Sequence, residues 1–127
     1  MSVVLDASAL LAYLQLEPGH EKVGGVLAQS IMSTVNWAEV IGIASAAGVN
    51  TEGLLMDLEA LGLVLAPFSA TQAETAGQLS VSTRHLGLSL GDRACLALGI
   101  ERDCPVHTAD RAWLRLQVGV AIEAIRP

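Results

Sequence analysis

The sequence predicts an α/β sandwich, in which a mostly parallel sheet of four to five short strands is flanked by helices. Two observations lead to this prediction. Short apolar runs alternate with longer segments whose apolar residues recur at helical spacing. The chain has 127 residues and is 52% hydrophobic, so we expect residues 1–127 to form a single domain. Strands that alternate with helices tend to pair in parallel, because each helix carries the chain back across the sheet.

The first part of the chain is expected to contain two strands and three helices. In order, these are a strand at 2–5, helices at 7–15 and 21–29, a strand at 31–32 and a helix at 34–47. Pro18 and Gly19 separate the first two helices, because neither residue favours a continuous helix. Ser33 or Thr34 caps the third helix, and Gly48 ends it.

The second part is expected to add three strands and four helices. In order, these are helix 51–61, strand 63–66, helices 69–83 and 89–100, strand 106–107, helix 111–116 and strand 120–124. Leu54, Leu58 and Leu61 lie at helical spacing in the first of these segments. Pro67 closes the strand that follows, and Ser89 is a favourable residue to open a helix.

Composition excludes several classes of protein. No apolar run reaches the roughly 18 residues of a membrane span, and the start of the chain lacks the charged region of a signal peptide, so a cytoplasmic protein is expected. Cys95 and Cys104 lack CxxC spacing, which favours reduced thiols over a disulfide or a zinc site. The net charge of −6 argues against a broad basic surface for nucleic acid, although five of the seven basic residues lie within 84–115.

Four acids follow predicted strands closely. Asp6 comes directly after the first strand, and Asp110 comes three residues after strand 106–107. Glu39 lies about one turn into the helix after strand 31–32, and Asp92 lies in the first turn of the helix opened by Ser89. Because ligands of open parallel sheets bind outside the carboxyl ends of the strands, we expect all four acids to face one site.

Each acid also has a purely structural interpretation. Asp6 and Asp110 could cap helices, Asp92 could form a capping box with Ser89, and Glu39 could pair with a buried arginine. A cluster of all four is harder to explain in this way. Two carboxylates about 5 Å apart repel by roughly 3 kcal/mol at an effective dielectric of about 20. A divalent cation would compensate, and oxygen ligands favour Mg²⁺ or Mn²⁺ over zinc. Such an ion activates water for in-line attack on a phosphodiester.

Four segments that contain these acids together resemble the motifs of a known family. Residues 3–11, 36–40, 88–97 and 106–113 resemble the four motifs of the PIN domain, in order. Size and motif order are most similar to the VapC-like toxins of bacterial toxin–antitoxin pairs. The resemblance implies an Mg²⁺- or Mn²⁺-dependent endoribonuclease whose catalytic and metal-binding residues are Asp6, Glu39, Asp92 and Asp110. It also implies polar helpers at Ser8 and Thr108, a homodimer, and a cognate antitoxin whose tail covers the site.

Other polar and aromatic residues have weaker claims to a role. Arg93 and Arg111 each directly follow a candidate metal ligand. Either could bind an RNA phosphate, form a surface ion pair or bind an antitoxin carboxylate. Trp37 and Trp113 are expected to be core or interface anchors rather than platforms for bases. The histidines, His20, His85 and His107, show no Ser-His-Asp or Cys-His pattern, so no catalytic role is expected for them.

Three other functions compete with a toxin ribonuclease. An aspartyl-nucleophile phosphatase also starts with a strand that ends in Asp, but its second acid would stand at position 8, where this chain has Ser8. A catalytically silent PIN-fold module could bind an antitoxin or regulate transcription with it. A general RNA-processing nuclease would have the same site and no antitoxin.

Overall fold

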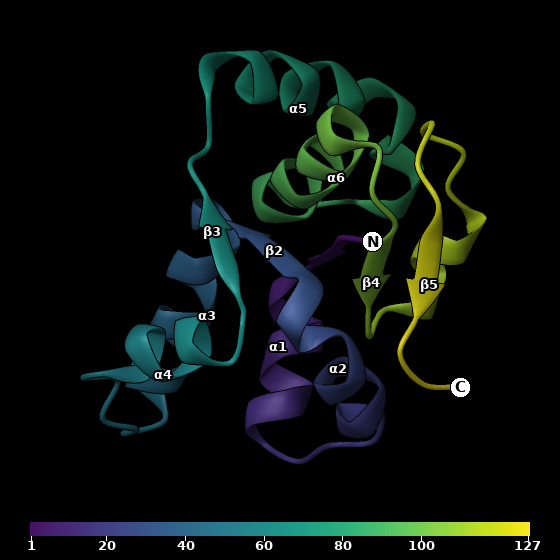
Figure 1. Ribbon diagram of the computed structural model, residues 1–127. Coiled ribbons are helices and arrows are strands. Elements are labelled where there is room, and N and C mark those ends of the chain that lie inside the picture. Colours follow the sequence, from purple (N-terminus) through teal and green to yellow (C-terminus); the bar gives the residue numbers. More distant parts are fainter.

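The computed structural model describes residues 1–127 and contains every strand and helix that the sequence predicts (Figure 1). In chain order the elements are β1 (Val3–Leu5), α1 (Ala7–Leu14), α2 (His20–Val26), the 3-10 helix η1 (Leu27–Gln29), β2 (Ser30–Ser33), α3 (Thr34–Ala46), α4 (Leu54–Ala60), β3 (Val64–Ala66), α5 (Ala70–Ser82), the 3-10 helix η2 (Arg84–Leu86), α6 (Leu90–Arg102), β4 (Val106–Thr108), the 3-10 helix η3 (Arg111–Arg115) and β5 (Ile122–Ala124). The predicted α/β class is therefore confirmed.

All five strands pair in parallel, in the order β3-β2-β1-β4-β5. The chain starts at the central strand, moves outward through β2 to β3, and then returns to build β4 and β5 on the other side. The order therefore reverses between β1 and β4, and ligands of open α/β sheets bind outside the carboxyl ends of the strands at such a reversal. Asp6 follows β1 and Thr108 ends β4, so both lie at this place.

Helices cover both faces of the sheet, as expected for parallel strands. Val3 and Leu5 of β1 belong to a buried cluster with α1, α2 and α4, whereas Val4 belongs to a second cluster with α5 and α6. Figure 1 shows α5 and α6 on one side of the sheet and α1 and α2 on the other. Alternate residues of one strand thus anchor both helical layers.

Element boundaries depart from the predictions where local geometry changes. The helix predicted at 51–61 begins at Leu54, because Gly53 adopts a φ of 78° and stands outside the helix as its N-cap. The helix predicted at 21–29 passes into a 3-10 turn at Leu27, and the helix predicted at 111–116 is 3-10 throughout. Strand β4 extends one residue further than predicted, to Thr108. No helix combines the length and the apolar character that a membrane crossing requires.

Candidate active site

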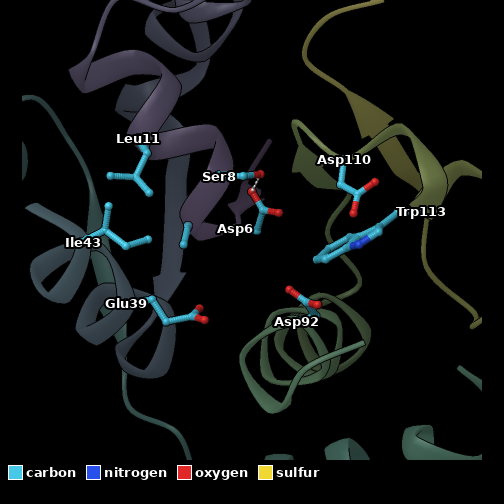
Figure 2. Close-up of a pocket in the computed structure, with 9 residues that line it drawn as sticks. Asp6, Ser8, Leu11, Glu39, Ile43, Asp92, Asp110 and Trp113 are labelled. Carbon is cyan, nitrogen blue, oxygen red and sulfur yellow. Dashed lines mark hydrogen bonds between the residues drawn. The ribbon is translucent and has the colours of Figure 1, made fainter. Parts of the chain in front are cut away.

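All four predicted acids line the single pocket of the molecule, which has a volume of about 230 Å³ (Figure 2). The nine lining residues are Asp6, Ala7, Ser8, Leu11, Glu39, Ile43, Asp92, Asp110 and Trp113. None of them is basic, so the pocket concentrates negative charge with no cationic side chain of its own. Their exposure increases outward: Asp6 is buried, Glu39 and Asp92 are half-buried, and Asp110 is exposed.

Asp6 is the innermost carboxylate, and its side chain is only 4% exposed. It accepts hydrogen bonds from Thr108 Oγ1 at 2.5 Å, from Ser8 Oγ at 2.8 Å and from the Ala9 amide at 2.8 Å, the last of which caps α1. Burial raises the pKa of Asp6 from 3.8 to about 6, because these hydrogen bonds offset the loss of hydration only in part and the charge of Asp92 opposes ionisation. The ionised form of Asp6 therefore lacks a compensating positive charge.

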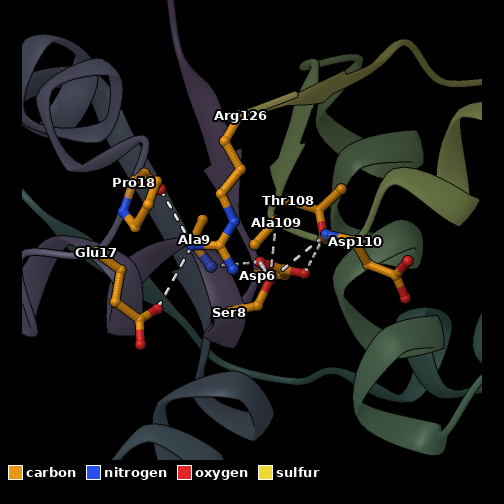
Figure 3. Close-up of polar contacts among 9 residues, drawn as sticks. All are labelled: Asp6, Ser8, Ala9, Glu17, Pro18, Thr108, Ala109, Asp110 and Arg126. Carbon is orange, nitrogen blue, oxygen red and sulfur yellow. Dashed lines mark hydrogen bonds and ion pairs between the residues drawn. The ribbon is translucent and has the colours of Figure 1, made fainter.

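Ser8 and Thr108 connect Asp6 to the loop that carries Asp110 (Figure 3). The Ser8 hydroxyl accepts from the Ala109 amide at 3.0 Å, and the Thr108 hydroxyl accepts from the Asp110 amide at 3.0 Å. Each hydroxyl thus donates to Asp6 and accepts from the segment after β4. Ser8 and Thr108, the two predicted polar helpers, therefore link the carboxyl end of β1 to the carboxyl end of β4.

Glu39 and Asp92 approach the pocket from α3 and α6, respectively. Glu39 Oε1 accepts from Asn36 Nδ2 at 2.9 Å, and Glu39 forms no ion pair, so the interpretation of Glu39 as the partner of a buried arginine is wrong. Asn36 was not predicted as a site residue. Two sequence signals could have indicated it: Asn36 opens the segment 36–40 that resembles the second motif, and it precedes Glu39 by three positions on one helix.

Asp92 forms the predicted capping box with Ser89. Its carboxylate accepts from the Ser89 amide at 3.0 Å, and its own amide donates to Ser89 Oγ at 3.1 Å. Asp110 likewise caps η3, accepting from the Ala112 amide at 2.9 Å. Asp6, Asp92 and Asp110 therefore cap helices and line the pocket at once, so the structural and functional interpretations of these acids are compatible.

Neither of the two predicted phosphate-binding arginines lines the pocket. Arg93 Nη1 donates to the carbonyl oxygen of Ala76 on α5 at 2.8 Å, so a phosphate in the pocket would require this side chain to leave α5. Arg111 is exposed beside Asp110 and donates to the carbonyl oxygen of Arg126 at 3.4 Å. Trp113 is only 1% exposed and belongs to the core cluster of α6, which confirms it as a core anchor.

The family model of the PIN domain matches residues 3–118, which include all four acids. The chain belongs to the PIN domain family. PIN domains are nucleases that generally use divalent metal ions.

Solved structures share the PIN fold of this chain at low sequence identity. A toxin–antitoxin complex from Klebsiella pneumoniae has a TM-score of 0.75 and 17% identity, and the match covers 98% of each chain. VapBC2 from Rickettsia felis, bound to a promoter DNA fragment, has a TM-score of 0.72 and 18% identity, again over 98% of each chain. FitAcB from Neisseria gonorrhoeae has a TM-score of 0.66 and 19% identity, over 94% of this chain and 95% of that one. No curated protein matches the sequence.

The donor set of this PIN domain fits a hard divalent cation. The four carboxylates and the Ser8 hydroxyl that line the pocket all offer oxygen ligands, and the buried Asp6 has no positive partner. The structure contains no group of three or more His, Cys, Asp or Glu side chains arranged to hold one ion directly. Mg²⁺ fits such a pocket because it is usually bound through one or two carboxylates and keeps several of its own waters.

Proposed function

We propose that this PIN domain is a metal-dependent endoribonuclease and the toxin of a toxin–antitoxin pair. The observation that carries the proposal is the convergence of four carboxylates on one pocket that has no basic residue. Burial raises the pKa of Asp6, the innermost carboxylate, and repulsion from the charge of Asp92 raises it further. A bound divalent cation would offset this repulsion, and the same carboxylates would then serve as its ligands.

The four acids divide the work according to their positions. Asp6, Asp92 and Asp110 would surround the Mg²⁺ or Mn²⁺ ion, one or two of them bound to it directly and the others through its waters, and Glu39 would orient the attacking water from the rim of the same site. Ser8 and Thr108 favour the ionised form of Asp6 and orient it, because both donate hydrogen bonds to its carboxylate. When bound, the metal supplies an activated water and stabilises the charge that develops on the phosphate.

RNA is a polyanion and is repelled by the negatively charged pocket, so we expect RNA binding and cleavage to depend on the metal. Arg111 is the basic side chain placed to help, because it is exposed directly after Asp110 and its guanidinium contacts only a backbone carbonyl. One such contact orients a phosphate without turning the surface basic. Apolar wall residues Leu11 and Ile43 leave room beside the acids for a base or for a partner side chain.

The partners follow from the likeness to solved complexes. One of the similar structures is described as a toxin–antitoxin complex and another as VapBC2 bound to a promoter DNA fragment, and by extension we propose a cognate antitoxin that covers the pocket and a homodimer in the cytoplasm. Met56, Leu61 and Val64 are exposed apolar residues on and after α4. They provide surface that a second chain could cover.

The deciding experiment is cleavage of total cellular RNA by the purified protein with Mg²⁺ or Mn²⁺, compared with EDTA. Asp6→Asn and Asp92→Asn remove pocket charge, and Asp57→Asn is the matched control, because Asp57 is exposed on α4 outside the pocket. We expect metal-dependent cleavage by the wild-type protein and by Asp57→Asn, and none by the two pocket variants. The absence of cleavage by folded, antitoxin-free wild-type protein would refute the ribonuclease.

A catalytically silent PIN module, which binds an antitoxin or regulates transcription with it, is the second candidate. The observation in its favour is that no three acids are arranged to hold one ion directly. This candidate expects no metal binding in the pocket, so calorimetric titration of the wild-type protein with Mn²⁺ separates it from the nuclease.

A further inference from the structure

One side-chain amide joins the two helices that carry Glu39 and Asp92. Asn36 is 1% exposed, and its Nδ2 donates to Glu39 Oε1 at 2.9 Å and to the carbonyl oxygen of Gly91 at 3.0 Å. Both amide hydrogens are therefore used, one within α3 and one across to α6. Asn36 Oδ1 is buried without a partner, a cost that an apolar residue at this position would not incur.

Gly91 provides the space in which the Glu39 carboxylate lies. A Cβ atom at Gly91 would stand 2.5 Å from both carboxylate oxygens of Glu39, closer than a real Cβ atom comes to any neighbour. Gly91 lies in the first turn of α6 and has no left-handed φ, so backbone freedom does not explain the glycine. Glycine is explained instead by its lack of a side chain, although glycine has a lower helix propensity than alanine.

Together these two contacts set the spacing between acids of different helices. Gly91 directly precedes Asp92. The Glu39 carboxylate, which lies against Gly91, is therefore kept at a fixed distance from Asp92. Figure 2 shows Glu39 and Asp92 projecting toward each other from α3 and α6 across the pocket. Asn36 makes the only side-chain hydrogen bond to Glu39, which leaves the rest of the carboxylate available to the pocket.

We infer that Asn36 and Gly91 are positioning residues, which hold the Glu39 carboxylate at the N-terminus of α6 in register with Asp92 for metal binding. The inference rests on the proposed function of the four acids. Neither residue touches the reacting atoms; both act through Glu39. Partners that orient a metal-binding group typically change metal affinity or activity by about 10- to 100-fold when removed.

Gly91→Ala is the sharpest test, because its Cβ displaces only the end of a flexible side chain. We expect the dissociation constant for Mn²⁺, measured by calorimetry on the full chain, to rise about tenfold. The thermal midpoint in EDTA should stay at or above that of the wild type, because alanine favours a helix more than glycine. Gly77→Ala is the matched control: Gly77 lies in α5, and a Cβ there meets nothing within 4 Å. Its Mn²⁺ affinity should be unchanged.

A double-mutant cycle tests whether the effect passes through Glu39. In a Glu39→Ala background there is no carboxylate to displace, so adding Gly91→Ala should leave the Mn²⁺ affinity equal to that of Glu39→Ala alone. An equal loss with and without Glu39 would overturn the inference. Asn36→Ala supports it if the Mn²⁺ affinity of the folded fraction falls about tenfold, and contradicts it if only the thermal midpoint falls.

The failure of this inference can be told from failure of the proposed function. If the wild-type protein binds Mn²⁺ and cleaves RNA while Gly91→Ala and Gly77→Ala bind Mn²⁺ equally well, the function stands and the positioning role is wrong. If the wild-type protein neither binds Mn²⁺ nor cleaves RNA, both proposals are wrong.

Discussion

Carboxylates occupy two contrasting places beside the same sheet. In the pocket, Asp6 is buried among other acids with no basic residue, and burial raises its pKa to about 6. On β5, Glu123 receives Lys22 Nζ at 3.3 Å and His107 Nε2 at 3.0 Å, and chiefly the Lys22 hydrogen bond lowers its pKa. The second group, Lys22, His107 and Glu123, is an electrostatically complete cluster, because its carboxylate has a cationic partner within the fold, whereas no cationic side chain lines the pocket.

His107 shows how the complete cluster works. Burial lowers the pKa of His107, an effect larger than the opposing effect of the neighbouring Glu123 charge, so the neutral ring is favoured. Nε2–H then donates an ordinary hydrogen bond to Glu123, while Nδ1 is buried without a partner. The residue does not line the pocket. The Glu123 carboxylate is thus paired within the fold, whereas the pocket carboxylates are left free for the metal ion that we propose.

The largest effect is expected when the unsatisfied charge is removed. Asp6→Asn should lower metal-dependent RNA cleavage at least about a hundredfold, the scale of losing one group that stabilises transition-state charge. The same variant should raise the free energy of unfolding at pH 8 in EDTA by about 1–3 kcal/mol, because a buried charge disappears. Cleavage assays and urea denaturation measure the two effects. Lower stability together with retained cleavage would contradict this account of Asp6.

The pH dependence of stability should carry the signature of Asp6. Below pH 3.8 the group is protonated in both states; between 3.8 and about 6 only the folded state keeps the proton, so stability falls as pH rises. The loss reaches roughly 3 kcal/mol and is complete above the folded pKa. Urea denaturation from pH 4 to 8 in EDTA should show that the difference between Asp6→Asn and wild type widens over this range. A constant difference would contradict the raised pKa.

Metal should reverse the same penalty. At pH 7.5, Mg²⁺ or Mn²⁺ at about a hundred times its dissociation constant should raise the free energy of unfolding by about 2.7 kcal/mol. Asp6→Asn and Asp92→Asn should show little of this gain, whereas Asp57→Asn should show all of it. Thermal unfolding with and without metal measures the effect, and an equal gain in every variant would place the metal outside the pocket.

The smallest effect is expected in the complete cluster. Glu123→Gln should lower the free energy of unfolding by less than about 1 kcal/mol, because the side chains of the Lys22–Glu123 pair are 42% and 53% exposed and water screens their attraction. RNA cleavage should stay within about twofold of the wild type, since the cluster does not line the pocket. A strong loss of cleavage with intact stability would show that the two regions are coupled.

Much of the site could be predicted because its acids also carry local signals. The Ser89–Asp92 capping box and the cap formed by Asp6 are contacts between residues three apart, which sequence spacing reveals. The orientation of the Arg93 side chain toward α5, away from the pocket, could not be predicted, because its acceptor, the Ala76 carbonyl oxygen, lies 17 residues away in the sequence. His107 does not line the pocket, and its partner on β5 had no signal in the sequence.

The order of strands and helices, the caps and the residue types at the strand ends could all be predicted, since they depend on periodicity and on hydrogen bonds within a turn. Which strand ends meet depends instead on tertiary packing. The order β3-β2-β1-β4-β5 brings Thr108 to Asp6 across 102 positions, and the packing of α3 on α6 brings Asn36 to Gly91 across 55. Such contacts form because two helical layers must cover one sheet, a demand of the whole core that no short stretch of sequence records.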